Sequence, residues 1–155
     1  MSRRHEGRIL ALQFLFQRDF NTDDLEAALA DFWALHSVRP RLREFAESLI
    51  RGVEQMRPSL DERLRQFLVN WELSRLAAVD RNILRLALYE MLHRPDIPPV
   101  VSLNEAIDLA KEFGDPDSPR FVNGVLDRAV QTLQRPAREP ATGRSVRGST
   151  QSRKG

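Results

Sequence analysis

The most regular hydrophobic pattern in the chain lies between residues 76 and 92. On a helical wheel, its apolar side chains cover an arc of roughly 200°; they are Leu76, Val79, Ile83, Leu84, Leu86, Ala87, Leu88 and Met91. Because so wide an arc needs packing partners on several sides, we expect the central helix of an all-α domain here. Asp80 interrupts the arc, where an unpaired carboxylate would be costly to bury. We expect it to pair either with an arginine of this chain or with a partner molecule.

Apolar residues recur at helical spacing in six other segments, which predicts about seven helices, three followed by four. Pro58 is expected to end the third helix, and Ser59 with Glu62 would form a capping box for the fourth. A second capping box, Ser102 with Glu105, is expected to begin the helix that ends near Gly114. No segment predicts a strand.

The periodicity stops after residue 134. Residues 135–155 are rich in Pro, Gly, Ser and Thr, which predicts a disordered tail, and they hold six basic residues and one acidic residue. The rest of the chain holds 18 basic and 21 acidic residues, so any nucleic-acid surface there must be a local patch. Of the 24 basic residues 22 are arginine, which suits bidentate phosphate contacts, although an arginine-rich codon usage would give the same excess.

Several classes of function find no support in the sequence. The chain has no cysteine, so it forms no disulfides or thiolate metal sites, and a cytoplasmic setting is expected. No apolar run approaches the ~18 residues that span a membrane. There is no glycine-rich phosphate loop or nucleophile elbow, and the three histidines lack metal-ligand spacing. We therefore expect no enzyme, no cofactor and no metal site.

Two segments could contact RNA. Arg4, Arg8 and Arg18 share one side of the first helix, which indicates either a phosphate-binding stripe or a solvated helix face. Near the start of the last helix, Phe121 lies at the edge of the apolar arc, with Arg128 on its polar side. An aromatic ring in that position could stack on an RNA base or could belong to the core.

Three stretches resemble the NusB family of bacterial transcription antitermination factors: VDRNILRLALYEM at 79–91, IPPVVSLNEAIDLAKEFG at 97–114 and FVNGVLD at 121–127. ALQFLFQ at 11–17 also fits, and the resemblance covers residues 4 to 134. It implies two small helical subdomains sharing a core, here at about 1–57 and 58–134. It also implies a protein that, with a small-subunit ribosomal protein, binds single-stranded boxA RNA of ribosomal RNA leader transcripts. With other Nus factors on RNA polymerase, such an assembly suppresses premature termination.

The resemblance also implies roles for individual residues. The RNA-binding candidates, which include Arg128 from the helical wheel, are Arg3, Arg4, Arg8, Arg120, Phe121 and Arg128. Phe16 and Asp80 are the candidates for contact with the ribosomal protein. Two alternatives remain: a helical protein-interaction module without RNA specificity, and a stand-alone RNA-targeting domain acting in ribosomal RNA modification or processing.

Overall fold

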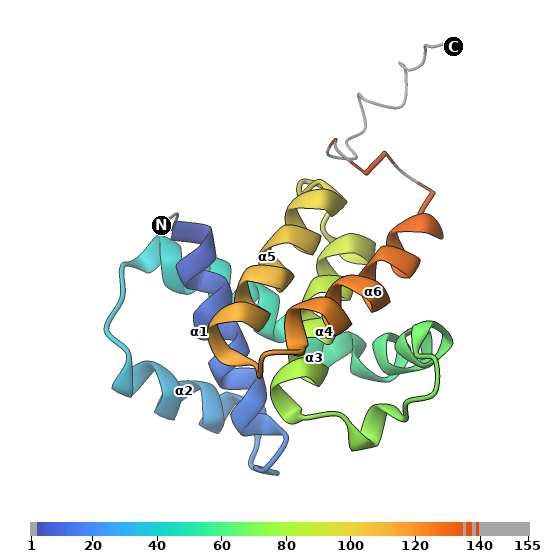
Figure 1. The fold of residues 1–155 in the computed structure, drawn as a ribbon. Coiled ribbons are helices and arrows are strands. Elements are labelled where there is room, and N and C mark those ends of the chain that lie inside the picture. The colour runs from blue at the N-terminus through green and yellow to red at the C-terminus, as the bar shows by residue number, and fades with distance from the viewer. Residues whose placement is uncertain (1–2, 135, 138, 140–155) are drawn as a thin grey trace.

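The fold is all-α, as predicted, in a computed structural model that describes residues 3–134, 136, 137 and 139 (Figure 1). Six α-helices and one short 3-10 helix, η1, make up the regular structure of these residues. They are α1 (Arg3–Arg18), α2 (Leu25–Leu35), α3 (Pro40–Phe67), η1 (Leu73–Arg75), α4 (Ala78–His93), α5 (Pro99–Phe113) and α6 (Ser118–Gln131).

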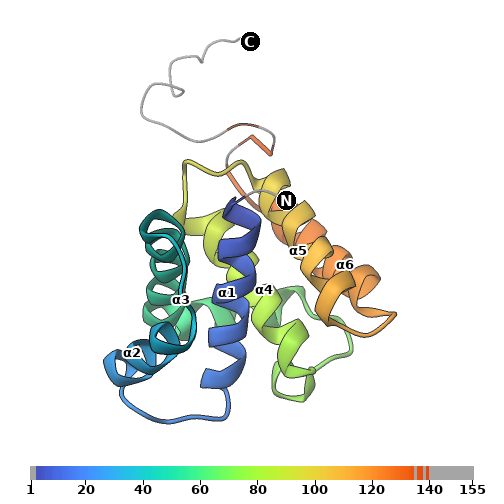
Figure 2. The same cartoon turned by 90° about the vertical axis from the view of Figure 1, so that its left-hand side faces the viewer.

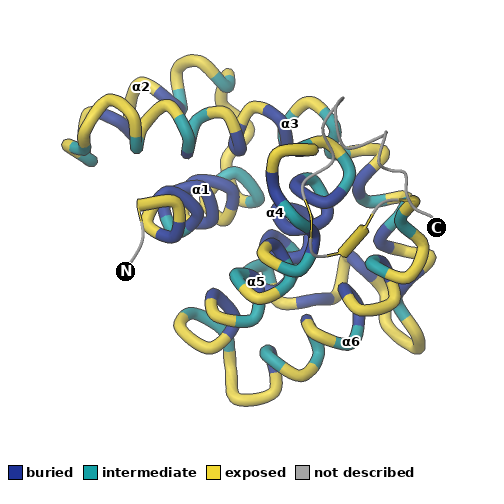
Figure 3. The backbone as a smooth tube through the Cα atoms, turned by 90° about the horizontal axis from the view of Figure 1, so that it is seen from above, coloured by how far each residue is buried: buried dark blue, intermediate teal, exposed yellow. Residues whose placement is uncertain are grey.

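Helix α4 is the centre of the fold, which confirms the prediction from its wide apolar arc. It contacts α1, α3, α5 and α6, and Figures 1 and 2 show it between the α1–α3 side and the α5–α6 side. Figure 3 shows the buried positions concentrated where these helices meet. Every residue from Asn82 to Leu88 is buried, including Arg85. The narrow polar side of the wheel is therefore buried as well.

The predicted break at Pro58 is wrong, because α3 continues through this proline to Phe67. Proline inside a helix removes one backbone hydrogen bond and costs about 3 kcal/mol or more. The apolar face of α3 stays in phase across the proline, and Leu60 and Leu64 are completely buried. Ser59 makes no cap; its hydroxyl donates to the Met56 carbonyl at 3.0 Å. Burial of one continuous face thus outweighs the local break, and six helices replace the expected seven.

The helices form two groups, α1–α3 and α4–α6, which lie side by side (Figure 2). The boundary expected near residues 57 and 58 falls inside α3. We therefore propose that α1–α3 and α4–α6 are the two small subdomains, with α4 packed against both.

Most of the predicted disordered tail, residues 135–155, lies outside the described residues. Ala137 is described, and its carbonyl accepts a hydrogen bond from the Val100 N–H at 2.8 Å, near the start of α5. Among the described helices, none combines the length and the apolar character needed to cross a membrane.

Candidate nucleic-acid interface

Arg8 lies inside the protein and not on an exposed arginine stripe. It is 3% exposed, and its Nε and Nη2 donate to the two carboxylate oxygens of Glu90 at 2.8 and 2.9 Å. Burial lowers the pKa of Arg8, but the hydrogen bonds and charges of Glu90 and Glu105 raise it, and the net pKa is above its ordinary value. In this conformation Arg8 links α1 to α4 and has no surface to offer a phosphate.

The expected capping box at Ser102 and Glu105 is wrong, because α5 begins three residues earlier with Pro99 in its first turn. Both side chains instead point toward the interior. The Ser102 hydroxyl donates to Glu90 Oε1 at 2.7 Å, and Glu105 Oε1 lies 2.8 Å from His5 Nδ1. These residues complete a polar cluster with Arg8 that joins α1, α4 and α5.

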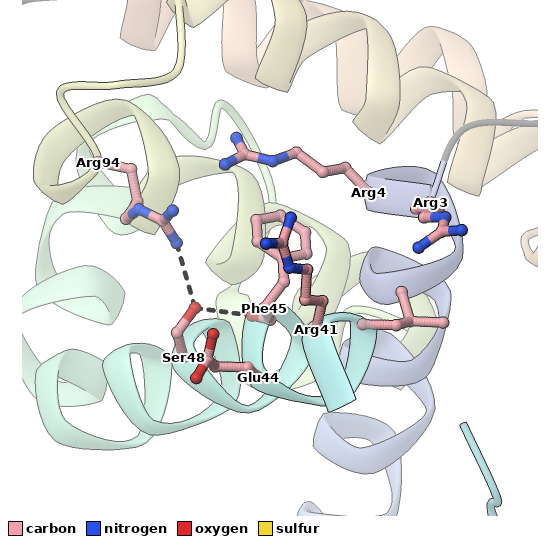
Figure 4. Close-up of a pocket in the computed structure, with 8 residues that line it drawn as sticks. Arg3, Arg4, Arg41, Glu44, Phe45, Ser48 and Arg94 are labelled. Carbon is pink, nitrogen blue, oxygen red and sulfur yellow. Dashed lines mark hydrogen bonds between the residues drawn. The ribbon is translucent and has the colours of Figure 1, made fainter. Parts of the chain in front are cut away.

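Arg3 and Arg4 are exposed in the first turn of α1. The Arg4 guanidinium lies 4.7 Å from the centre of the Phe45 ring and 3.5 Å from Asp96. Both arginines line a cleft into which Arg94 also projects (Figure 4). Of the three N-terminal candidates for RNA contact, Arg3, Arg4 and Arg8, the first two are open to a ligand here.

Asp80 and Phe121 lie together, although the sequence assigned them to different partners. They line one pocket of about 250 Å³ between η1, the start of α4 and the start of α6. Phe121 is half-buried, and its ring meets that of Trp71 edge to face at a centroid distance of 5.8 Å. Trp71 is 59% exposed, so the mouth of this pocket, which we call the Asp80 pocket, is aromatic.

The carboxylate of Asp80 has no ion-pair partner within the described part of the chain. Asp80 is 8% exposed, no described arginine lies within ion-pair distance, and its Oδ1 accepts no hydrogen bond from the described residues. Burial raises the pKa of Asp80; the Ser118 hydroxyl partly offsets this rise, and the charge of Asp115 adds to it. Asp80 therefore has no arginine partner among the described residues, and pairing with a partner molecule stays a prediction.

Of the remaining candidates, Phe16 and Arg120 lie at the same end of the bundle as the Asp80 pocket, whereas Arg128 is in the last turn of α6. Phe16 is 38% exposed near the end of α1, and that end is held to the start of α4 by Asp19 and Arg81, which are 2.9 Å apart. Arg120 is exposed in the first turn of α6. The Nε of Arg128 donates to the Phe67 carbonyl at 2.9 Å, so this arginine also caps the end of α3.

Comparison with known proteins identifies the family. The sequence model of the NusB family matches residues 5–131. The chain belongs to the NusB family. It is 46% identical over 138 residues to the transcription antitermination protein NusB of Anaeromyxobacter dehalogenans, covering 88% of this chain and 96% of that protein. For the Myxococcus xanthus protein of the same name, the identity is 40% over 140 residues, covering 88% and 100%.

Solved NusB structures share the fold. T. maritima NusB superimposes with a TM-score of 0.78 at 38% identity, covering 87% of this chain and 94% of that one. A crystal structure of the antitermination factors NusB and NusE in complex with double-stranded RNA gives a TM-score of 0.77, covering 86% and 99%. At 23% identity this second likeness concerns the fold alone. NusB is a non-enzymatic family, which confirms the prediction that the chain is not an enzyme.

The sequence did not single out Arg41, Phe45 or Arg94, which share the cleft with the N-terminal arginines of this NusB-family chain. These residues come from the start of α3 and the end of α4, far from residues 3 and 4 in the sequence. One local signal was present: arginines at positions 39, 41 and 43 surround Pro40, with no acidic residue in the first helical turn.

The raised pKa of Asp80 leads to a stability prediction for this NusB-family protein. Above that pKa the buried carboxylate is charged and destabilises the fold, whereas the unfolded chain ionises near the ordinary value of 3.8. Asp80→Asn should therefore raise the free energy of unfolding at pH 7 by about 1 kcal/mol. The gain should shrink as the pH falls through the raised pKa and vanish below 3.8.

Urea unfolding at pH 7 and at pH 3.5 measures this difference, with the exposed Asp108→Asn as the matched control. If the Asp80→Asn protein were less stable than wild type at pH 7, the hydrogen bonds that the Asp80 carboxylate accepts would outweigh the cost of its burial.

Proposed function

We propose that this chain is a transcription antitermination factor that binds single-stranded boxA RNA of ribosomal RNA leader transcripts together with a small-subunit ribosomal protein. The observation that carries the proposal is 40–46% identity, over nearly their whole length, to relatives named transcription antitermination protein NusB. A structure of the same fold was solved as a complex of NusB with NusE and RNA, which supports the choice of partner classes. The setting is the bacterial cytoplasm, with other Nus factors and RNA polymerase.

The charges of the two candidate surfaces favour a division of labour. Arg3 and Arg4 present exposed guanidinium groups, whose planar donors match phosphate oxygens. The Asp80 pocket instead gathers three carboxylates, Asp80, Asp115 and Asp117, around a single arginine, Arg75. We assign the phosphate backbone to the N-terminal end of α1 and a cationic side chain of the ribosomal protein to the Asp80 pocket.

Phe121 combines features of both candidate surfaces. It borders the acidic pocket, yet Arg120 beside it adds an exposed positive charge at the start of α6. A half-buried ring next to an exposed Trp71 leaves aromatic surface available for stacking, which does not require phosphate close to the carboxylates. We propose that an RNA base stacks here while the strand continues toward Arg3 and Arg4. Arg8 would not contact the strand itself, but its ion pair with Glu90 fixes the position of α1 against α4.

Phe121→Ala tests this site. Loss of a stacked base should weaken boxA binding by roughly 1–3 kcal/mol, measured by titration of labelled RNA at constant salt. Phe20→Ala, which removes a 72% exposed ring from the turn after α1, serves as the control and should leave the affinity for RNA alone unchanged. If Phe121→Ala lowers only the thermal stability, the ring belongs to the core and the proposed stacking site is wrong.

A further inference from the structure

The cationic surface around Arg3 and Arg4 extends onto α3 and the residue after α4. A cleft of about 670 Å³, here called the arginine cleft, opens between α1, the start of α3 and the residue that follows α4 (Figure 4). Its charged and aromatic lining consists of Arg3, Arg4, Arg41, Arg94, Phe45 and Glu44. Ligand sites typically measure roughly 300–1,000 Å³, so the cleft has room for part of a polymer strand.

Phe45 organises the arginines of this cleft. The guanidinium carbons of Arg4 and Arg94 lie 4.7 and 5.5 Å from the centre of its ring, within the range of cation–π attraction. Behind the ring, Gly7 leaves no room for a side chain, since a Cβ there would lie 2.6 Å from a Phe45 carbon. The ring is thus fixed against α1 and holds together guanidinium groups that would otherwise repel one another.

Arg41 occupies a position that the stability of its helix does not explain. It follows Pro40 in the first turn of α3, which contains no acidic residue. Cations are unfavourable at this end of a helix, because the helix dipole places partial positive charge there. Arg41 is exposed and forms no ion pair with the other described residues.

The carboxylates near the cleft neutralise only part of its charge. Arg94 donates to both oxygens of Asp96 at 3.1 and 3.2 Å. Burial raises the pKa of Asp96, but the hydrogen bonds and charge of Arg94 and the charge of Arg4 lower it, and the net pKa is below its ordinary value. Counted against the formal charges of Asp96 and Glu44, the four arginines still leave two positive charges in excess.

We propose that the arginine cleft binds the phosphodiester backbone of the RNA strand, with Arg41 and Arg94 extending the surface begun by Arg3 and Arg4. The inference rests on the proposed RNA-binding function and adds α3 and the end of α4 to it. Arginine forks match phosphate oxygens in pairs, and an open cleft with excess positive charge on rigid helices suits a polyanion. These contacts position the strand and do not read its bases.

Arg41→Ala and Arg41→Glu test the inference. Loss of one charged phosphate contact should weaken binding of single-stranded boxA RNA about tenfold and reduce the slope of log K against log[salt] by about 0.7. An unrelated single-stranded RNA should lose affinity by the same factor. Thermal unfolding should stay unchanged for Arg41→Ala and shift slightly upward for Arg41→Glu, because an acid suits that helix end.

Arg65→Ala is the matched control, since it removes one exposed arginine from the same helix, roughly 36 Å away at ~1.5 Å per residue. It should change neither the affinity nor the salt slope. If both Arg41 variants bind RNA like wild type, the inference is overturned while the proposed function stands. If they weaken binding of the ribosomal protein alone and not of RNA, the cleft is a protein-docking site. If wild type binds no RNA, the proposed function itself fails, and this subsite with it.

Discussion

Replacing Arg8 with methionine should lower the free energy of unfolding by about 3–5 kcal/mol, because it leaves Glu90 buried without its counter-charge. Glu90 is 1% exposed, and the Ser102 hydroxyl would then be its strongest donor. Water cannot replace the lost guanidinium without opening the contact between α1 and α4. Urea unfolding at pH 7 measures the loss.

A double variant separates the buried charge from simple loss of packing. Arg8→Met combined with Glu90→Gln removes both charges, and the amide can still bond with Ser102, so much of the lost stability should return. RNA affinity per folded molecule should stay within about twofold of wild type in both variants, because Arg8 is not exposed to a ligand. A stable Arg8→Met protein that fails to bind RNA would show instead that Arg8 contacts phosphate.

Asp19→Asn should lower the free energy of unfolding by about 3 kcal/mol, a large effect like that of Arg8→Met. Its carboxylate, 8% exposed, accepts from Arg57 at 3.3 Å, Arg81 at 2.9 Å, Arg85 at 3.1 Å and Asn82 at 2.9 Å. A neutral amide would leave three guanidinium groups close together with less compensating charge. The loss of stability should stay below about 5 kcal/mol, the upper end of the range for breaking a buried ion pair, because Arg85 keeps its bidentate ion pair with Asp61 of α3.

The same carboxylate gives a pH dependence. Burial raises the pKa of Asp19, but hydrogen bonds from Asn82 and Arg81 and the charges of Arg85 and Arg81 lower it, and the net pKa is below 3.8. The stability that Asp19 contributes is therefore complete above 3.8 and lost as the pH falls through the lower, folded-state pKa. The difference in unfolding free energy between wild type and Asp19→Asn should shrink between pH 5 and pH 2. A constant difference would mean that the ionised form is not the one that stabilises.

The hydrophobic periodicity predicted the fold class and the central helix, because a 3.6-residue repeat directly reports which face is buried. It could not predict that Asn82 and Arg85 are buried too. Their burial depends on Asp19 and Asp61, which lie 24 to 66 residues away in the sequence. The helix break at Pro58 was mispredicted for the opposite reason: a strong local signal was overruled by packing along the whole of α3.

The candidate site was predictable where a residue contradicted its own local pattern. Asp80 stood out as a charge within an apolar arc, and the structure finds it buried with an unbonded oxygen. Arg8 was predicted to be exposed because a helical wheel places it beside Arg4. The wheel cannot show that Glu90 of α4 lies opposite and pairs with it. Arg41 and Arg94 join Arg4 only through tertiary folding, so no spacing rule within one helix would group them.

We expect this helical body, which has no reaction centre, to hold an RNA strand and a ribosomal protein at the same time. The most direct measurement is a titration of the wild-type protein with boxA RNA and with a shuffled RNA of equal length, over a range of salt, with and without the small-subunit ribosomal protein. We expect boxA to bind more tightly than the shuffled RNA, the ribosomal protein to strengthen that binding, and the slope of log K against log[salt] to be near −0.7 for each phosphate contacted. Equal affinity for the two RNAs at every salt concentration, with or without the ribosomal protein, would contradict this expectation.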